Sequence, residues 1–261
     1  MLFRSIRLAV TTRLKPISFL SSVAVAAPGS DLMYEGIDIR AASSARPIDE
    51  SHANGYATGK WAGEVLLREA HDLCALPVTV FRSGMILAHG RYTGQLNVPD
   101  SFTRLVLSLI ATGIAPGSFY RGDAGRAHYD GLPGDFVAAS VAALGSGTPG
   151  HRTFNVVNPH DDGVSLDTVV DWLADSGIAL RRVGDYREWR EQFEAALREL
   201  PDKQRQRSLL PLMRAWQEPA IPRAGSAFPA ERFQDAVRSI PHLSRTLVEK
   251  YVSDLRHLGL I

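Results

Sequence analysis

Apolar positions along the first third of the chain predict one helix and two strands. Between Leu2 and Val10 an apolar residue recurs every fourth position, which predicts a helix over Leu2–Arg13. The run Ile17–Ser22 then predicts a buried strand. A second apolar run, PVTVFR at Pro77–Arg82, is typical of a strand buried on both faces of a parallel sheet.

A loop and a longer helix are expected between these two strands. Residues 28–54 are polar and irregular, and Asn54 is a suitable N-cap for the helix that follows. The apolar face expected for that helix comprises Ala62, Val65, Leu66, Ala70 and Leu73. Strand, helix and strand in this order indicate a doubly wound α/β sheet. The loop Ser83–Pro99 then leaves the carboxyl end of a strand, where such sheets bind ligands.

Beyond Pro99 the pattern predicts mainly helices. The expected helices are Asp100–Gly113, Pro133–Leu144, Ser165–Ser176, Tyr186–Leu200, Gln204–Trp216, Ala230–Ser239 and Leu243–Leu258. The expected strands are Thr153–Val157 and short pieces at Ser118–Tyr120 and Ala127–Tyr129. We therefore expect residues 1–99 to be the C-terminal part of a dinucleotide-binding, Rossmann-like domain and residues 100–261 to be a helix-rich, substrate-binding lobe.

The glycines change this expectation in one respect. A dinucleotide-binding sheet normally opens with a strand, a glycine-rich turn and a helix whose N-terminus binds the pyrophosphate. None of the 22 glycines lies in such a context. The expected fold class is therefore α/β, with a partial Rossmann-like parallel sheet that lacks its first βαβ units and their glycine-rich loop.

Composition indicates an ordinary globular protein. Of its 261 residues 45% are apolar and 22% are charged, and the formal net charge of +1 gives no reason to expect nucleic acid or an anionic membrane as a partner. No apolar run approaches the roughly 18 residues of a membrane span. The single cysteine, Cys74, excludes an internal disulfide and fits a cytoplasmic location.

Residues 1–30 are open to two interpretations. They contain no acidic residue, begin with basic residues, and end an apolar stretch in Ala-Val-Ala-Ala, as a secretory signal does. The same residues also fit the helix and the buried strand described above. This window alone does not decide between them.

The stretch HANGYATGKWAGEV places Tyr56 four residues before Lys60, one of only four lysines. Residues four apart share a helix face. At an effective dielectric near 20, an ammonium roughly 6 Å from a phenol favours the phenolate by about 3 kcal/mol. Tyr56 is therefore expected to donate a proton to an oxygen that gains charge. Ser21 and Ser22, at the end of the neighbouring strand, are candidates to orient a carbonyl.

Two structural alternatives stand beside this chemistry. By chance, a chain of this composition contains such a tyrosine–lysine spacing about 0.1 times, so the pair alone also fits a half-buried tyrosine beside a solvated lysine. The cluster His160, Asp161 and Asp162 is explained more simply by a turn before a helix capped by Ser165 than by a metal site. A serine hydrolase is not supported, because no G-x-S-x-G motif is present.

The motifs SSV, YATGK and FRSGMIL, in this order, resemble the extended short-chain dehydrogenase/reductases. Further segments resemble one branch, the C-terminal thioester-reductase domain of carboxylic acid reductases: NGYATGKWAGEVLLREAHDLCALPVTVFRSGMILAHGRYTGQLNVPD, GIAPGSFY, RAHYDGLPGDFVA, NPHDDGVSLDTVVDWL and PHLSRTLVEKYVSDLRHLGLI. The resemblance runs from about Leu8 to Ile261. It assigns TTRLKPISFLSSVAVA to a helix end and a central strand rather than to a signal peptide, and it implies an N-terminally truncated domain.

This resemblance implies an activity and a set of site residues. The activity is NADPH-dependent reduction of an acyl thioester, held on the phosphopantetheine arm of a carrier domain, to an aldehyde. Tyr56 is then the proton donor, and Lys60 binds the nicotinamide ribose and makes Tyr56 more acidic. Ser22, in preference to Ser21, hydrogen-bonds the carbonyl. Ser83, on the loop after the second strand, approaches the nicotinamide.

Two departures from the family pattern lead to further expectations. Without a glycine-rich phosphate loop, the chain is expected to bind NADPH weakly, unless a separate chain supplies the missing half. Gly84 stands where the family usually has aspartate, which removes a charge and frees the backbone of a loop expected to respond to substrate. The alternatives are a catalytically silent fragment of such an enzyme and a sugar epimerase or dehydratase of the same superfamily.

Overall fold

The structure, a computed structural model, describes residues 2–26, 33–42, 52–122, 127–147 and 149–261. At residues 52–54 it describes the backbone alone. Much of the predicted loop at 28–54 therefore lies outside the described residues.

The chain forms two compact units, each assembled from three segments. The first unit comprises Met1–Gly84, Phe136–Pro159 and Ala227–Pro241, and the second comprises Met85–Asp135, His160–Ser226 and His242–Ile261. The units therefore do not follow the order of the chain. The expected functional division, with cofactor binding by residues 1–99 and substrate binding by residues 100–261, stays a prediction.

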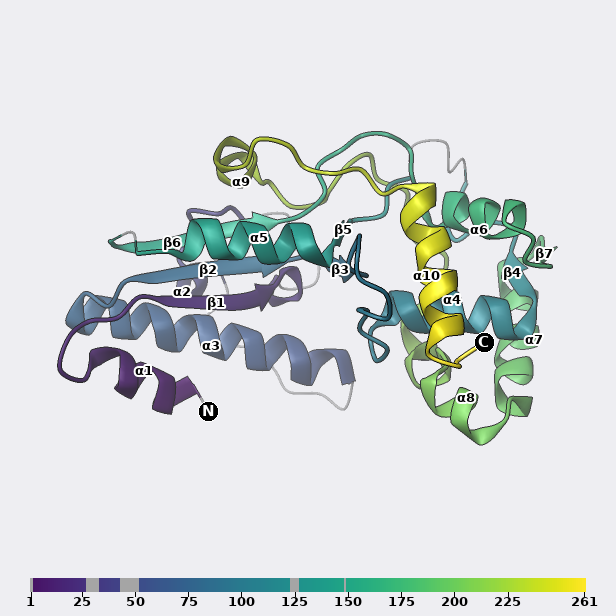
Figure 1. Ribbon diagram of the computed structural model, residues 1–261, viewed down its shortest axis with the longest axis horizontal. Helices are drawn as coiled ribbons and strands as arrows, with labels where there is room; N and C mark the ends of the chain where they lie inside the picture. Colours follow the sequence, from purple (N-terminus) through teal and green to yellow (C-terminus); the bar gives the residue numbers. More distant parts are fainter. Residues whose placement is uncertain (1, 27–32, 43–51, 123–126, 148) are drawn as a thin grey trace. The chain divides into compact units, whose positions relative to one another are not determined.

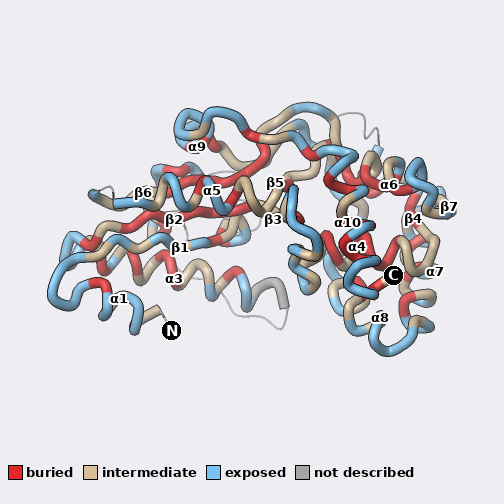
Figure 2. The backbone as a smooth tube through the Cα atoms, in the orientation of Figure 1, coloured by how far each residue is buried: buried red, intermediate tan, exposed pale blue. Residues whose placement is uncertain are grey.

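A parallel sheet of three strands in the order β1-β2-β6 forms the centre of the first unit (Figure 1). Its strands are β1 (Ile17–Ser22), β2 (Val78–Ser83) and β6 (His151–Val156). In register, Ser22 pairs with Ser83 and Ser83 pairs with Val156, so the three strands end level with one another. The central strand β2 is buried along its whole length (Figure 2). The predicted α/β architecture with a parallel sheet is confirmed.

Helices cover both faces of this sheet (Figure 1). The helical elements of the unit are α1 (Leu2–Val10), η1 (Val23–Val25), α2 (Ile39–Ala42), α3 (His52–Cys74), most of α5 (Gly134–Gly145) and α9 (Glu231–Ala236). Gly63 of α3 packs against Phe19, and Gly145 of α5 packs against Ser18. Because consecutive strand residues point to opposite faces, α3 and α5 lie on opposite sides of β1.

The buried face of α3 agrees with the predicted one in part. Ala70 is buried as predicted, whereas Leu73 is 83% exposed, and the buried positions also include Gly63, Glu64 and Leu67. A count of apolar residues misses part of this face, because a glycine and a carboxylate also contact the sheet. The helix also begins at His52, two residues before the expected cap at Asn54.

The second unit is rich in helices and holds two short two-stranded parallel sheets, β3-β5 and β4-β7. Its elements are β3 (Met85–Leu87), α4 (Ser101–Thr112), β4 (Ile114–Pro116), β5 (Gly131–Pro133), α6 (Leu166–Asp175), β7 (Arg181–Val183), α7 (Tyr186–Glu199), α8 (Asp202–Arg207), η2 (Leu210–Trp216) and α10 (Arg245–His257). Asp100 and Ser165 cap α4 and α6, and Gly113 ends α4 in the left-handed conformation. These boundaries agree with the sequence because caps are local signals.

Shorter elements of this unit were predicted less well. The strands expected at Ser118–Tyr120 and Ala127–Tyr129 are displaced to β4 and β5, and Tyr120 makes one isolated bridge to Ala220. Strand β7 has no counterpart among the predictions, because three residues are too few to show alternation. The helix expected at Gln204–Trp216 is divided into α8 and the 3-10 helix η2, which has a proline in its first turn.

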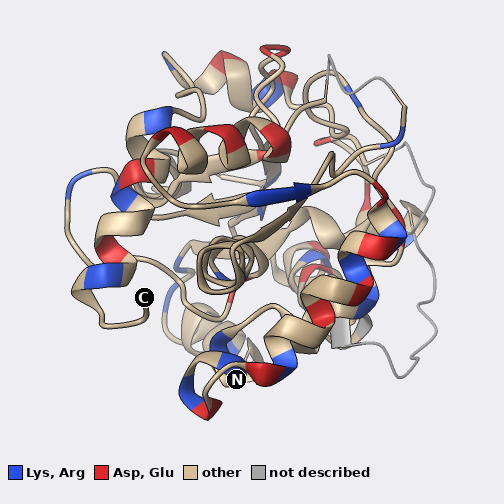
Figure 3. Ribbon diagram, turned by 90° about the vertical axis from the view of Figure 1, so that its right-hand side faces the viewer, with Lys and Arg blue, Asp and Glu red and all other residues tan. Residues whose placement is uncertain are grey.

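Basic and acidic residues are interspersed along the helices (Figure 3), in keeping with a net charge near zero. Among the helices that the structure describes, none combines the length and the apolar character needed to cross a membrane.

Candidate active site

The two candidate serines at the end of β1 have different surroundings. Ser21 is buried, and its hydroxyl donates a hydrogen bond of 2.5 Å to Oε1 of Glu64. Ser22 is the N-cap of η1, where its Oγ accepts from the backbone N–H of Ala24 at 3.2 Å. A hydroxyl that accepts one hydrogen bond can still donate its proton. The hydroxyl of Ser22 can therefore donate to a ligand, whereas that of Ser21 already donates to a carboxylate.

Tyr56 and Lys60 lie one turn apart on α3, as their spacing predicted. The Nζ atom of Lys60 is 5.6 Å from the ring centroid of Tyr56 and 5.5 Å from that of Phe19. It also donates a hydrogen bond of 2.7 Å to the backbone carbonyl of Leu20. Lys60 therefore connects α3 to β1 two residues before Ser22.

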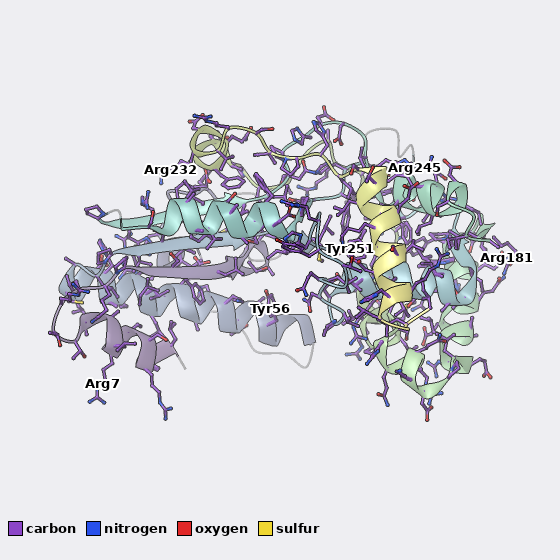
Figure 4. The ribbon with its side chains drawn as sticks, viewed as in Figure 1. Arg7, Tyr56, Arg181, Arg232, Arg245 and Tyr251 are labelled. Carbon is purple, nitrogen blue, oxygen red and sulfur yellow. The ribbon has the colours of Figure 1, made fainter. Side chains whose placement is uncertain are left out.

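The electrostatics of this pair follow from its exposure. Burial lowers the pKa of the Lys60 ammonium below its usual range. Tyr56 is 54% exposed, in the first turns of α3 (Figure 4). The proton-donor role of Tyr56 stays a prediction.

Ser83 ends β2 directly beside Ser22, its register partner on β1. It is 4% exposed, and its Oγ has no hydrogen-bond partner in the described structure. A buried hydroxyl without a partner is uncommon and indicates a group that meets a ligand or water. Gly84, which follows it, donates its N–H to the carbonyl of Val156 at 3.0 Å. The consequence expected from glycine at this position stays a prediction.

A buried ion pair beside these residues was missed in the sequence. Arg82 is 1% exposed and Glu64 is 2% exposed, and their side chains make hydrogen bonds of 2.7 to 3.1 Å. One signal could have indicated a pair. Arg82 is a charge within an otherwise apolar strand, which is rare unless the charge is paired.

The residues present fit one end of a nicotinamide cofactor. Lys60 and Tyr56 are hydroxyl-binding groups, and the unpartnered Oγ of Ser83 lies at the carboxyl edge of the sheet, where parallel α/β folds bind ligands. For metal binding, no group of three or more His, Cys, Asp or Glu suits an ion in the described part of the chain. Oδ1 of Asp162 accepts from the backbone N–H of Val164 at 3.0 Å, which is the turn expected there.

A parallel sheet with serine, tyrosine and lysine near one edge resembles the NAD(P)-binding reductase domains of the extended short-chain type. A model of the NAD-binding family described as male sterility protein matches residues 2–141, and the chain belongs to that family.

Individual relatives are more specific. The chain is 52% identical over 271 residues to the carboxylic acid reductase of Mycobacterium marinum, an alignment that covers 98% of this chain and 23% of that protein. The solved reductase domain of a nonribosomal peptide synthetase from Mycobacterium tuberculosis is 48% identical, with a TM-score of 0.93 over 100% of this chain and 64% of that chain. These matches confirm the predicted resemblance to the reductase domains of carboxylic acid reductases.

A more distant likeness concerns the fold alone. The UDP-glucose 4-epimerase of Bifidobacterium longum is 15% identical, with a TM-score of 0.60 over 99% of this chain and 69% of that chain. The chain therefore shares a Rossmann-like fold with such epimerases. It spans less than a quarter of the length of the curated carboxylic acid reductase that it matches.

Proposed function

We propose that this chain carries out, in the cytoplasm, the NADPH-dependent reduction of a carrier-bound acyl thioester to an aldehyde. The observation that carries the proposal is the position of Lys60, whose ammonium lies against the ring of Tyr56 and is hydrogen-bonded to β1 two residues before Ser22. This contact supports a site in which the phenol of Tyr56 and the ammonium of Lys60 act beside the strand that carries Ser22. The likeness to carboxylic acid reductases supports this reaction class.

Each residue has a separate role in this proposal. Ser22 donates a hydrogen bond from its hydroxyl to the carbonyl oxygen of the thioester and so orients that carbonyl, while keeping its proton. Tyr56 transfers its phenolic proton to the same oxygen as negative charge develops there. When bound, NADPH supplies the hydride that reduces the carbonyl carbon. The resulting thiohemiacetal separates into the aldehyde and the free thiol of the phosphopantetheine arm.

Two side chains hold the cofactor in this account. Lys60 hydrogen-bonds the hydroxyls of the nicotinamide ribose, and the hydroxyl of Ser83 contacts the nicotinamide. Gly134 directly follows β5 and begins α5, and Gly184 follows β7, but each stands alone. Neither forms a glycine-rich loop that could bind the pyrophosphate. We therefore expect weak binding of NADPH unless a separate chain supplies that loop. The second half of the chain, residues 100–261, binds the acyl group.

Replacing Tyr56 by phenylalanine tests the proton-transfer step. Tyr56→Phe is expected to lower kcat for an acyl-pantetheine thioester at least 100-fold, because general acid catalysis contributes about 10²- to 10⁴-fold. Aldehyde formation would be measured at millimolar NADPH so that weak binding does not limit the rate. Tyr34→Phe, at another exposed tyrosine of the same unit, is the matched control and should retain the wild-type rate. Equal rates for Tyr56→Phe and the wild type would refute the assignment.

Two other outcomes identify the alternatives. A wild-type chain that forms no aldehyde at millimolar NADPH is a catalytically silent fragment. Turnover of a nucleotide sugar in place of the thioester would indicate an epimerase or dehydratase.

A further inference from the structure

The carboxylate of Glu64 is a junction between α3 and the first two strands. Oε1 accepts the hydroxyl of Ser21 at 2.5 Å and Nε of Arg82 at 3.1 Å. Oε2 accepts Nε and Nη2 of Arg82 at 3.0 and 2.7 Å. All three residues are at most 3% exposed. Hydrogen bonds between charged groups that are buried away from water are strong and directional.

The two strand residues of this junction are the neighbours of the candidate site residues. Ser21 and Arg82 are register partners on β1 and β2, and they precede Ser22 and Ser83, which are also register partners. The side chains of Ser21 and Arg82 point toward α3, where both bind Glu64. A displacement of Ser21 or Arg82 therefore displaces the backbone that carries the site serines.

On the helix, the residue before Glu64 packs closely against the sheet. A Cβ placed on Gly63 would lie 2.6 Å from Cζ of Phe19. Phe19 and Ser21 share one face of β1, so α3 meets this strand at two successive positions on that face. Close packing at Gly63 sets the distance between helix and strand, and the hydrogen bonds of Glu64 set the rotation and the height of the helix.

We propose that Glu64 is a positioning residue, which holds α3 on β1 and β2 through Ser21 and Arg82 and thereby places Tyr56 and Lys60 at the site. Glu64 lies one turn after Lys60 and two turns after Tyr56. The catalytic part of this inference rests on the proposed function. The structural part concerns where Lys60 lies and does not depend on turnover.

Lys60 reports on this position directly. Its hydrogen bond to the carbonyl of Leu20 and its partial burial both depend on the approach of α3 to β1. Burial lowers the pKa of its ammonium. If α3 loosens, Lys60 gains solvent and its pKa rises toward that of an ordinary lysine. Loss of the nearby negative charge alone would destabilise the ammonium and move the pKa in the opposite direction.

The experiment measures the pH profile of acetylation at each lysine by trace labelling and mass spectrometry, in the full chain. In the wild type, Lys60 is expected to titrate below the usual value of a lysine, because it is partly buried. In Glu64→Gln the profile of Lys60 should shift upward, toward that usual value. The matched control is Glu69→Gln on the same helix, which removes an exposed carboxylate paired with Arg40 at 2.5 Å and should leave Lys60 unchanged.

A double variant distinguishes a change in the position of α3 from a change in local charge and from unfolding of the protein. Glu64→Leu with Arg82→Met removes both buried charges, keeps a similar volume, and deprives Ser21 of its acceptor. Its net charge equals that of the wild type, so a shift of Lys60 reports position alone. We expect the double variant to unfold at nearly the wild-type temperature and Lys60 still to shift upward. An unchanged or lowered Lys60 profile in the double variant would overturn the proposal.

Measuring activity distinguishes a failure of the proposed function from a failure of the positioning role of Glu64. In a chain that reduces thioesters, the double variant should lower kcat at least tenfold and change KM for the thioester less than twofold. A wild-type chain that shows no reduction, together with an upward shift of Lys60, would reject the proposed function and retain the positioning role of Glu64.

Discussion

At the scale of single residues, the site depends on a few charged groups removed from water. Arg82 and Glu64 are both buried and are bound to each other by short hydrogen bonds. Such a pair contributes little net stability when it is intact, because burial costs each charge its hydration. When one partner is removed, however, the other remains charged without compensation. The pair should therefore be sensitive to single substitutions.

Arg82→Met is expected to lower the free energy of unfolding by about 3 to 5 kcal/mol, because it leaves the Glu64 carboxylate buried and unpaired. Urea unfolding at neutral pH would measure the loss. The matched control is Arg187→Met, which breaks an exposed pair with Glu191 on α7 and should cost less than about 1 kcal/mol. A loss at Arg82 no larger than that of the control would show that the buried pair is solvated.

Some of the residue-scale chemistry could be read from the sequence and some could not. The tyrosine–lysine neighbourhood is local, since four residues of helix bring the two side chains together whatever surrounds them. The bond between Glu64 and Arg82 joins a helix to a strand 18 residues later, so its geometry depends on packing. The different surroundings of Ser21 and Ser22 follow from strand alternation, but which face meets α3 had to come from the structure.

At the scale of elements, α3 determines where the candidate site lies. It packs closely on the sheet through Gly63, which leaves room for the ring of Phe19. The predicted apolar face was correct at Ala70 and wrong at Leu73, and it omitted Gly63 because this contact uses the absence of a side chain. Elements with strong local signals, such as α4 with its Asp100 cap and its Gly113 terminus, were predicted almost to the residue.

Gly63→Ala should therefore destabilise the protein although alanine favours helix. The added methyl overpacks the contact with Phe19, which typically costs about 1 to 3 kcal/mol. Gly59→Ala, on the same helix and with no atom within 4 Å of the added Cβ, is the control and should stabilise by up to about 1 kcal/mol. Thermal unfolding of both variants would measure this difference. Equal stabilisation by both substitutions would contradict the packing described for α3.

The start of β6 makes stability depend on pH. Burial, assisted by the nearby Arg68 cation, lowers the pKa of His151 to about 4. In the unfolded chain a histidine titrates near 6.5. Between these two pKa values the unfolded state binds more protons than the folded state. The free energy of unfolding should therefore fall as pH decreases from about 6.5 to about 4. Protonation of His151 should have no further effect below that pH.

His151→Asn is expected to reduce this dependence. Urea unfolding of the wild type and the variant at pH 7.5, 6 and 5 would compare the two slopes. As pH decreases, the free energy of unfolding should fall more for the wild type than for the variant. A difference that is constant over this range would show that His151 is not responsible.

At the scale of the whole molecule, the order of strands and helices identified the fold class, and local signals identified most long helices. The assembly of each compact unit from three separate segments did not follow from the sequence, because residues 136–159 and 227–241 join the first sheet through long-range packing. The family resemblance rested on motifs spread over the whole chain. It is confirmed by close relatives, although the chain spans 64% of the solved reductase domain.

The most direct test of the central claim follows one deuterium atom. The chain would be incubated with an acyl-pantetheine thioester and millimolar NADPH that carries deuterium at the transferable position of the nicotinamide, and the aldehyde would be examined by mass spectrometry. The account predicts aldehyde with deuterium at its carbonyl carbon from the wild type, and at least 100-fold less from Tyr56→Phe. Deuterated aldehyde in equal amounts from both proteins, or none from the wild type, would contradict it.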